Sequence, residues 1–297
     1  MSNVAVEFSR ALSSAFEQAE GSVLRVDGGR RRSASGTVYS ADGLVVTALH
    51  AIEREEGIEV FDGKESVGAT LVGADPGTDL ALLRAERPLG KPASFADEAE
   101  FARGQLALAI SRPGRSARAA LAVISALGGE WRGPRGSRVE RYLQLSLPLE
   151  PGYSGGLVID AQGRALGVGM AGILRATPLV LTRTTLERVA SAIAQHGRVR
   201  RGYLGANFQP VRLPAALAEQ SGQRAGLLIA GLEPGGPAEQ AGVLLGDVVL
   251  EAGGARLSSL DELFAALEEE RIDKPLALRL SRAGNDKTLD VVPRARP

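Results

Sequence analysis

The chain has 297 residues, with 35 lysines and arginines balanced by 35 aspartates and glutamates, no cysteine and only two histidines. Such a length is typical of about two domains. The zero net charge argues against a broad phosphate-binding surface. The lack of cysteine excludes disulfides, thiolate metal sites and a cysteine nucleophile. Because the chain has only two histidines, any catalytic imidazole must belong to His50 or His196.

Residues 1–20 are expected to form a helix that precedes the first domain. Four apolar residues recur about four positions apart and make one helical face: Val4, Phe8, Leu12 and Phe16. This face can either join copies of the chain or pack on the chain's own domain. Charged residues interrupt the segment, so it resembles neither a signal peptide nor a membrane helix. We expect a cytoplasmic location for the chain as written, or a periplasmic or other extracytoplasmic one if the chain is a trimmed form.

Residues 21–198 are expected to form one mainly-β domain. Short apolar runs are cut by glycine, proline and aspartate, with turn signals at Asp42-Gly43 and Gln162-Gly163. Many short strands with regular turns indicate a sandwich or a pair of barrels. The spacing then predicts a helix over 184–195, with Thr184 or Thr185 as its cap.

Residues 199–297 are expected to form a separate, small α/β domain that begins in the basic stretch 198–201. Their runs predict strands over 202–211, 226–232, 247–252, 275–282 and 287–293, and helices over 238–241 and 259–270.

A glycine-rich turn carries the candidate nucleophile, Ser154. Glycines at 152, 155 and 156 permit unusual backbone angles and close approach of a substrate. The backbone N–H groups of Gly152 and Ser154 can both face a developing oxyanion. An ordinary glycine-rich turn is the alternative.

His50 is the candidate general base. It ends an apolar strand at a place where a side chain can be held rigidly and still be reached. A buried structural histidine is the alternative for this position. His196 lies at a helix C-terminus, where a solvated cap is expected.

Asp79 is the best-placed carboxylate to orient His50, because it opens an apolar strand and can be buried there. Asp75, Asp97 and Asp160 are expected in turns or loops. The order His50, Asp79, Ser154 is that of the chymotrypsin-like double β-barrel. Such a triad needs no metal and no cofactor.

The motifs resemble those of the HtrA (Deg) family of serine proteases over nearly the whole chain. The stretch SGTVYSADGLVVTALHAI (35–52) resembles the family's histidine motif, DPGTDLALL (75–83) its aspartate motif and EPGYSGGLVIDAQGRALGV (150–168) its serine motif. GYLGA (202–206) and the long run over 226–267 are similar to the family's PDZ pattern. The resemblance implies a protease that cleaves unfolded or misfolded polypeptides in protein quality control.

Several residues depart from the family pattern near the serine and the histidine. Glu150 and Tyr153 stand where asparagine is common, Leu157 replaces a proline, and Leu49 replaces an asparagine before His50. None removes a member of the triad. The departures keep open a non-hydrolysing, chaperone-like scaffold as the alternative function.

The resemblance also implies a peptide-binding site in the last domain and self-association of the protease domain. Tyr203, Leu204 and Gly205 would receive a peptide C-terminus, and Leu263 or Leu267 would line the other wall of the groove. Arg200 and Arg201 would either assist the carboxylate or lie in a solvated linker. The family commonly forms trimers through N-terminal segments, and 112–120 and 128–138 resemble its regulatory loops.

Substrate preference can be read from the residue six positions before the serine, which lines the first pocket of chymotrypsin-like enzymes. Here that residue is Pro148, which cannot pair with lysine or arginine. We therefore expect cleavage after small or medium aliphatic residues, with Met170 as a further lining residue.

Overall fold

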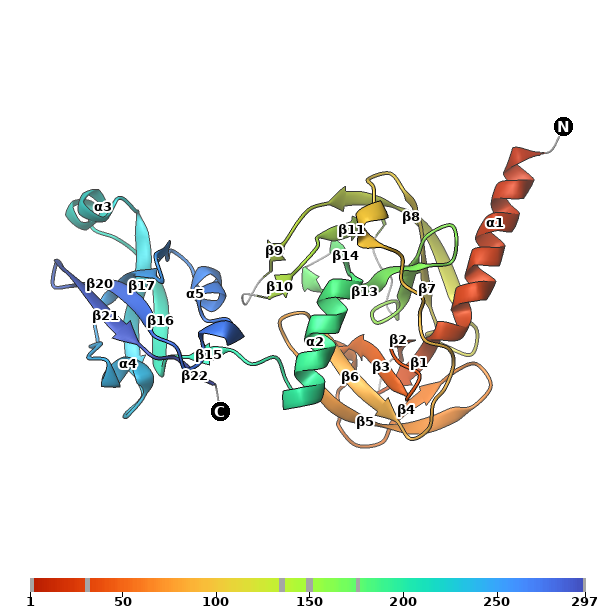
Figure 1. The fold of residues 1–297 in the computed structure, drawn as a ribbon, viewed down its shortest axis with the longest axis horizontal. Coiled ribbons are helices and arrows are strands. Elements are labelled where there is room, and N and C mark those ends of the chain that lie inside the picture. The colour runs from red at the N-terminus through yellow and green to blue at the C-terminus, as the bar shows by residue number, and fades with distance from the viewer. Residues whose placement is uncertain (1–2, 30–32, 134–136, 148–151, 175–176, 296–297) are drawn as a thin grey trace. The chain divides into compact units, whose positions relative to one another are not determined.

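The structure is a computed structural model that describes residues 3–29, 33–133, 137–147, 152–174 and 177–295. It forms two compact units, the first reaching Val199 and the second beginning at Arg200. The first unit contains two barrels, which meet along one seam, and the second contains an open sheet and a separate two-stranded pair (Figure 1).

The first barrel is a closed antiparallel sheet in the order β1-β2-β3-β6-β5-β4. Its strands are β1 (Val23–Asp27), β2 (Ala34–Val38), β3 (Leu44–Ala48), β4 (Ile58–Phe61), β5 (Ser66–Asp75) and β6 (Leu80–Ala85). The predicted Asp42-Gly43 turn joins β2 to β3, and Gly43 adopts φ 91° there. A short 3₁₀ helix, η2 (Leu49–Ala51), follows β3 and carries His50.

The second barrel closes in the order β11-β14-β13-β12-β7-β8. Its strands are β7 (Leu106–Ser111), β8 (Arg118–Leu127), β11 (Leu143–Leu145), β12 (Leu157–Ile159), β13 (Ala165–Leu174) and β14 (Thr177–Leu181). A second 3₁₀ helix, η3 (Glu98–Glu100), precedes β7. The predicted Gln162-Gly163 turn joins β12 to β13.

Helix α2 (Arg183–His196) covers the seam between the two barrels. Its apolar face, Leu186, Val189, Ala190 and Ile193, is buried as the sequence predicts. The same core cluster takes side chains from β3 and β6 of the first barrel and from β13 and β14 of the second. The catalytic candidates lie along this seam, so the core that joins the barrels also fixes the site.

Helix α1 (Val4–Ala19) and the 3₁₀ turn η1 (Glu20–Ser22) precede β1. The C-terminal half of α1 packs on the second barrel, where Ala15 and Ala19 are buried beside Leu12 and Phe16. The N-terminal half is exposed, with Phe8 at 42% exposure. Of the predicted apolar face, Leu12 and Phe16 pack on the chain's own second barrel, whereas Val4 and Phe8 are exposed.

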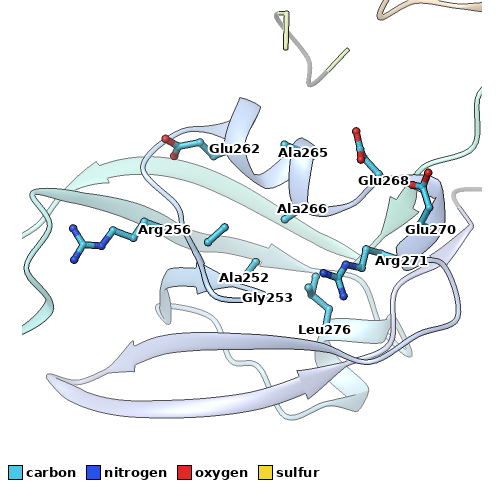
Figure 2. Close-up of a pocket in the computed structure, with 11 residues that line it drawn as sticks. Ala252, Gly253, Arg256, Glu262, Ala265, Ala266, Glu268, Glu270, Arg271 and Leu276 are labelled. Atoms are coloured by element: carbon cyan, nitrogen blue, oxygen red, sulfur yellow. The ribbon is translucent and has the colours of Figure 1, made fainter. Parts of the chain in front are cut away.

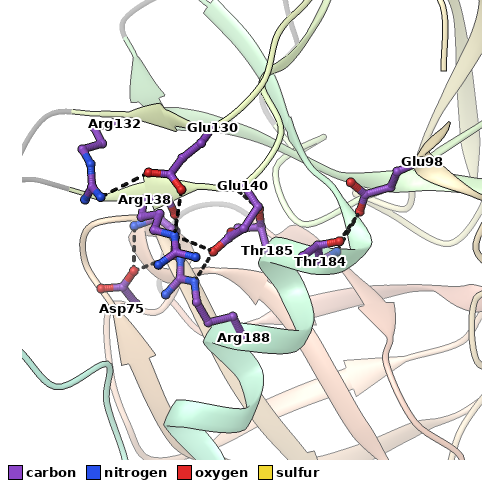
Figure 3. Close-up of polar contacts among 10 residues, drawn as sticks. Asp75, Glu98, Glu130, Arg132, Arg138, Glu140, Thr184, Thr185 and Arg188 are labelled. Carbon is purple, nitrogen blue, oxygen red and sulfur yellow. Dashed lines mark hydrogen bonds and ion pairs between the residues drawn. The ribbon is translucent and has the colours of Figure 1, made fainter. Parts of the chain in front are cut away.

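A two-stranded ribbon of β9 (Trp131–Arg132) and β10 (Arg138–Val139) is tied to α2 by charged side chains (Figure 3). The largely buried carboxylate of Glu140 pairs with Arg188 of α2 and, at 3.2 Å, with Arg138. The Glu140 backbone N–H donates to Thr185 Oγ1 at 3.1 Å. These bonds fix the base of the segment that resembles a regulatory loop.

The second unit has a sheet in the order β16-β17-β18-β20-β21, with β19 beside β18, and a separate β15–β22 pair. Its strands are β15 (Gly202–Tyr203), β16 (Ala206–Arg212), β17 (Ala225–Leu232), β18 (Val248–Ala252), β19 (Ala255–Arg256), β20 (Leu276–Arg282), β21 (Asn285–Val291) and β22 (Arg294–Ala295). Its helices are α3 (Ala215–Ser221), α4 (Pro237–Gln240), α5 (Leu260–Ala266) and the 3₁₀ turn η5 (Glu269–Arg271). Ser259 and Glu262 form a capping box at the start of α5.

These elements confirm a mainly-β chain with two chymotrypsin-like barrels followed by a small α/β domain. The predicted cap of α2 is wrong, because Thr182 is the N-cap while Thr184 donates from both its backbone N–H and its hydroxyl to Glu98. The proposed loop over 112–120 ends earlier, since β8 already begins at Arg118.

Candidate active site

The structure brings His50 and Asp79 into direct contact. His50 Nδ1 and Asp79 Oδ2 lie 2.6 Å apart, and the His50 backbone N–H donates to Asp79 Oδ1 at 3.0 Å. The imidazole is half exposed, whereas the Asp79 side chain is 12% exposed. The hydrogen bond to Asp79 raises the pKa of His50 above its usual value, against the opposing effect of partial burial.

Local backbone geometry aims Asp79 at the imidazole. Asp79 adopts φ 56°, a left-handed conformation that aspartate tolerates better than most residues. Its carbonyl accepts a hydrogen bond from the Leu49 N–H at 2.7 Å. Asp75 acts as the predicted turn residue, because its carboxylate accepts from the Gly77 N–H and from the backbone and hydroxyl of Thr78.

Ser154 lies in the turn before β12 and is 5% exposed. Gly152 precedes it with φ 95° and Gly155 follows with φ 83°, angles that residues with a side chain rarely adopt. A Cβ at Gly155 would lie 2.1 Å from Ser35 O, so a glycine is also needed for space. The glycines that suggested a nucleophile turn are therefore required by its conformation and packing.

Two consecutive residues of β13 link the three candidates. The Ala171 N–H donates to Ser154 Oγ at 3.3 Å. A Cβ on the neighbouring Gly172 would lie 2.2 Å from Asp79 Oδ2 and 3.0 Å from His50 Nδ1. Ser154 and the His50–Asp79 pair thus meet on the same short stretch of strand. Ser154 Oγ is bonded to Ala171 rather than to His50 in this structure.

Sequence reasoning missed the hydroxyls that hold the nucleophile turn from the first barrel. Ser35 Oγ donates to Gly152 O at 2.6 Å, and Thr37 Oγ1 donates to Gly155 O at 3.0 Å. Both residues lie in β2, whose five residues are all buried. Hydroxyls in a fully buried strand need partners, but the sequence does not say which residues supply them.

The specificity-pocket candidates are not supported in the same way. Pro148 lies outside the described residues, as does Glu150. Met170 is fully buried in the core that joins the two barrels, because its side chain packs with the apolar residues of that seam. It therefore does not open to a pocket in this structure, and Ala171 and Gly172 are the β13 residues that face the site.

Two of the departures from the family pattern have structural explanations. Tyr153 is buried in the core of the second barrel, where it anchors the turn beside Ser154. Leu157 is buried at the start of β12 and pairs with Val168 and Ile110. Tyr153 thus fills the core of the second barrel, and Leu157 packs in the cluster that α1 covers.

His196 lies in the last turn of α2, before Gly197 in the left-handed conformation, as expected for a helix end. Within the described ranges, no group of three or more histidine, aspartate or glutamate side chains could hold a metal ion. In the same residues no helix is both long enough and apolar enough to cross a membrane.

In the second unit, Tyr203 ends β15, and Leu204 and Gly205 lie between β15 and β16, with Gly205 at φ 68°. The Gly202 N–H donates to Leu267 O at 2.7 Å, which ties this loop to the end of α5. Leu263 and Leu267 are both buried in the domain core. They therefore do not form an exposed surface in this structure. Arg200 pairs with Glu269 at 4.0 Å.

A hollow of about 430 Å³ lies between α5, the β18–β19 hairpin and η5 (Figure 2). Alanines 252, 255, 265 and 266 form much of its lining, and side chains of both charges surround them, including Glu262, Glu268, Arg256 and Arg271. None of the predicted peptide-binding residues lines it.

Comparison with known proteins agrees with this architecture. Residues 34–168 match the family model of the trypsin-like peptidase domain, and residues 202–292 match that of the PDZ domain. A probable periplasmic serine endoprotease, DegP-like, from Marinomonas sp. (strain MWYL1) is 30% identical over 91% of this chain and 58% of its own length. A putative serine protease, HhoB, from Synechocystis sp. is 30% identical over 87% of this chain and 65% of its own.

Solved structures extend the likeness over both units. The HtrA-type protease AlgW with a tripeptide is 27% identical, with a TM-score of 0.71 over 96% of this chain and 97% of that one. A serine endoprotease from Yersinia pestis, 23% identical with a TM-score of 0.73 over 96% of this chain and 98% of that one, shares the fold. The chain spans only 58% of the length of the Marinomonas relative. The chain therefore consists of a trypsin-like peptidase domain followed by a PDZ domain, and its homologues are HtrA- and DegP-type serine proteases.

Proposed function

We propose that this chain is a serine endopeptidase that cleaves unfolded or misfolded polypeptides through an acyl-enzyme. The observation that carries the proposal is the bonded His50–Asp79 pair, which meets Ser154 at Ala171 and Gly172 of β13. The printed names of the relatives, which describe serine endoproteases, support the same reaction class.

In acylation, Ser154 Oγ attacks the scissile carbonyl while His50 Nε2 accepts the hydroxyl proton. Ser154 Oγ accepts from the Ala171 N–H and makes no hydrogen bond to His50 in this structure, so the side chain must first turn toward His50. His50 then protonates the leaving amine, and in the second step it activates the water that hydrolyses the ester. Asp79 keeps the imidazole oriented and stabilises its charged form without taking the proton.

The N–H groups of Gly152 and Ser154 are the proposed oxyanion donors. Within the described residues, neither N–H donates to another protein group. Both are thus available to a substrate oxygen. Loss of one such donor costs roughly 10²–10³ in kcat in related sites.

The preference for small or medium aliphatic residues before the scissile bond remains a proposal that rests on Pro148. Cleavage of a peptide library would test it, and faster cleavage after arginine than after valine or leucine would contradict it.

We also propose that the PDZ domain binds peptide C-termini. Strand β16 ends the sheet, so its outer edge can receive a peptide as an additional strand. The Leu204–Gly205 loop stands at the start of that strand, where backbone N–H groups can receive a carboxylate. A C-terminal peptide should bind and its amidated form should not, as measured by calorimetry.

Self-association and an extracytoplasmic location complete the proposal. The exposed Val4, Val6 and Phe8 on α1 support association of copies, in keeping with the trimer that the resemblance implies. Sedimentation of the chain and of Phe8→Ser tests this contact. The word periplasmic in the Marinomonas relative's name supports the location, which cell fractionation can test.

Reaction with a fluorophosphonate probe tests the central claim. The chain should be labelled at Ser154, and Ser154→Ala should lose both labelling and peptide hydrolysis while keeping its circular dichroism. Ser125→Ala, which changes an exposed serine bonded to Gln144 O, is the matched control and should keep both activities. Substantial hydrolysis by Ser154→Ala would refute the assignment.

A further inference from the structure

A second serine, Ser35 of β2, touches the nucleophile turn from the first barrel. It is fully buried, and its hydroxyl has two partners outside its own sheet. Ser35 Oγ donates to Gly152 O at 2.6 Å and accepts from the Arg112 N–H at 2.8 Å. A buried hydroxyl that is satisfied in both roles holds its partners firmly, because neither bond can be lost without leaving a buried polar group unpaired.

The backbone of Ser35 adds two more bonds at the same point. Its N–H donates to Ser154 O at 3.3 Å, and its carbonyl accepts from Thr47 Oγ1 at 2.7 Å. Ser35 therefore contacts the carbonyls of Gly152 and Ser154, the two residues whose N–H groups are the proposed oxyanion donors. Thr47, from β3, holds Ser35 itself in place.

The turn needs such an external support. Gly152 at φ 95° has no side chain to restrict its backbone, so the direction of the adjoining peptide planes must be set by neighbouring atoms. Pro113 packs against Gly152 on one side, where an added Cβ would lie 2.7 Å from the proline ring. Ser35 Oγ provides the polar contact that fixes the Gly152 carbonyl.

We propose that Ser35 is a positioning residue for the oxyanion hole. It acts through Gly152 and Ser154 by joining the end of β7, at Arg112, to the nucleophile turn, and it has no contact with the substrate. The inference rests on the proposed peptidase function and adds to it a contribution of the first barrel to oxyanion binding. Without Ser35, the first barrel supplies to the site only the triad residues His50 and Asp79.

The test compares Ser35→Ala with the wild type and with Ser125→Ala on an aliphatic fluorogenic peptide. We expect kcat of Ser35→Ala to fall by roughly 10², the usual cost of a misplaced reacting geometry, with little change in KM. The pH at which activity is half lost on the acid side should stay unchanged, because the His50–Asp79 bond is untouched. General loosening of the site would move KM and the pH profile as well.

Inhibitor binding gives a second, independent readout. A peptide aldehyde forms a tetrahedral adduct whose oxygen occupies the oxyanion hole, whereas the matching peptide alcohol cannot. Ser35→Ala should weaken the aldehyde by about the same factor as kcat and leave the alcohol unchanged. Equal losses for both inhibitors, or a kcat within threefold of the wild type, would overturn the inference.

Two controls separate other outcomes. If the wild type fails to react with a fluorophosphonate, the proposed function is wrong, whereas a reactive wild type with an unchanged Ser35→Ala refutes only the role of Ser35. If Ser35→Ala does not fold, Ser35→Cys fills nearly the same space with a weaker donor. It should then show the same selective loss of kcat and aldehyde affinity, and normal values in this variant would refute the role.

Discussion

Gly172 has space for no side chain, because it lies directly against the catalytic pair. A Cβ added there would stand 2.2 Å from Asp79 Oδ2 and 2.8 Å from its carboxyl carbon. Favourable contacts between heavy atoms need about 3.5 Å, so Gly172→Ala must displace the carboxylate or the strand by about 1 Å. The backbone of Asp79 is held by the Leu49 N–H, so the side chain has to give way. The 2.6 Å bond to His50 then lengthens or breaks.

We expect Gly172→Ala to lose about 10² in kcat/KM, since a shift of about 1 Å at a reacting group costs that much. The pH profile should also move. Asp79 raises the pKa of His50, and catalysis needs the neutral imidazole. A weakened bond lowers this pKa, so the acid limb of kcat/KM shifts to lower pH even as the maximum falls.

The assay is steady-state hydrolysis of an aliphatic fluorogenic peptide from pH 5 to pH 9, with circular dichroism as the check on folding. Gly21→Ala is the matched control, because its Cβ would meet no heavy atom within 4 Å. The reasoning fails if Gly172→Ala retains the activity of Gly21→Ala, or if its activity falls while the acid limb stays in place.

The other predictions concern the same pair and the core beneath it. In the wild type, activity on the acid side of the kcat/KM profile should be half lost above pH 6.5, the usual pKa of histidine. The reason is that Asp79 raises the pKa of His50 and activity is lost as the imidazole gains its proton. A midpoint at or below pH 6.5 would contradict this. Asp79→Asn should lower kcat by about 10⁴ with the fold intact, and a loss under tenfold in steady-state kinetics would argue that another group orients His50. Ile193→Ala empties a fully buried position at the seam and should cost about 2–5 kcal/mol in denaturant unfolding, whereas the exposed Ser191→Ala should change little.

The sequence predicted best what is local. His50 at the end of an apolar strand and Asp79 at the start of another are recognisable from their own neighbours, and the structure places both where the patterns put them. The end of α2 at Gly197 follows from a local rule in the same way. The start of α2 was not predicted correctly. The Thr184 hydroxyl donates to Glu98, 86 residues away, and Thr182 is the N-cap.

Contacts across the barrel seam could not be read from the sequence. Ser35 and Gly152 are 117 positions apart, and the sequence around neither residue predicts that the two form a hydrogen bond. The burial of Met170 could not be read either, because the sequence does not say which way its side chain points. Only the pairing of β13 with β14 sends it into the core and leaves Ala171 and Gly172 toward the site.

The bond between Ala171 N–H and Ser154 Oγ bears on which part of the site controls the rate. Turning the hydroxyl toward His50 can lose at most the neutral hydrogen bond that Ser154 Oγ accepts from the Ala171 N–H at 3.3 Å. Such a bond contributes about 0.5–1.5 kcal/mol, so its loss changes the rate by roughly tenfold at most. A displaced imidazole or oxyanion donor costs about 10² or more. Activity should therefore depend mainly on the space that Gly172 leaves beside the His50–Asp79 pair and on the bonds of Ser35 to the turn. Substitutions at these two positions should outweigh any that affect only the serine rotamer.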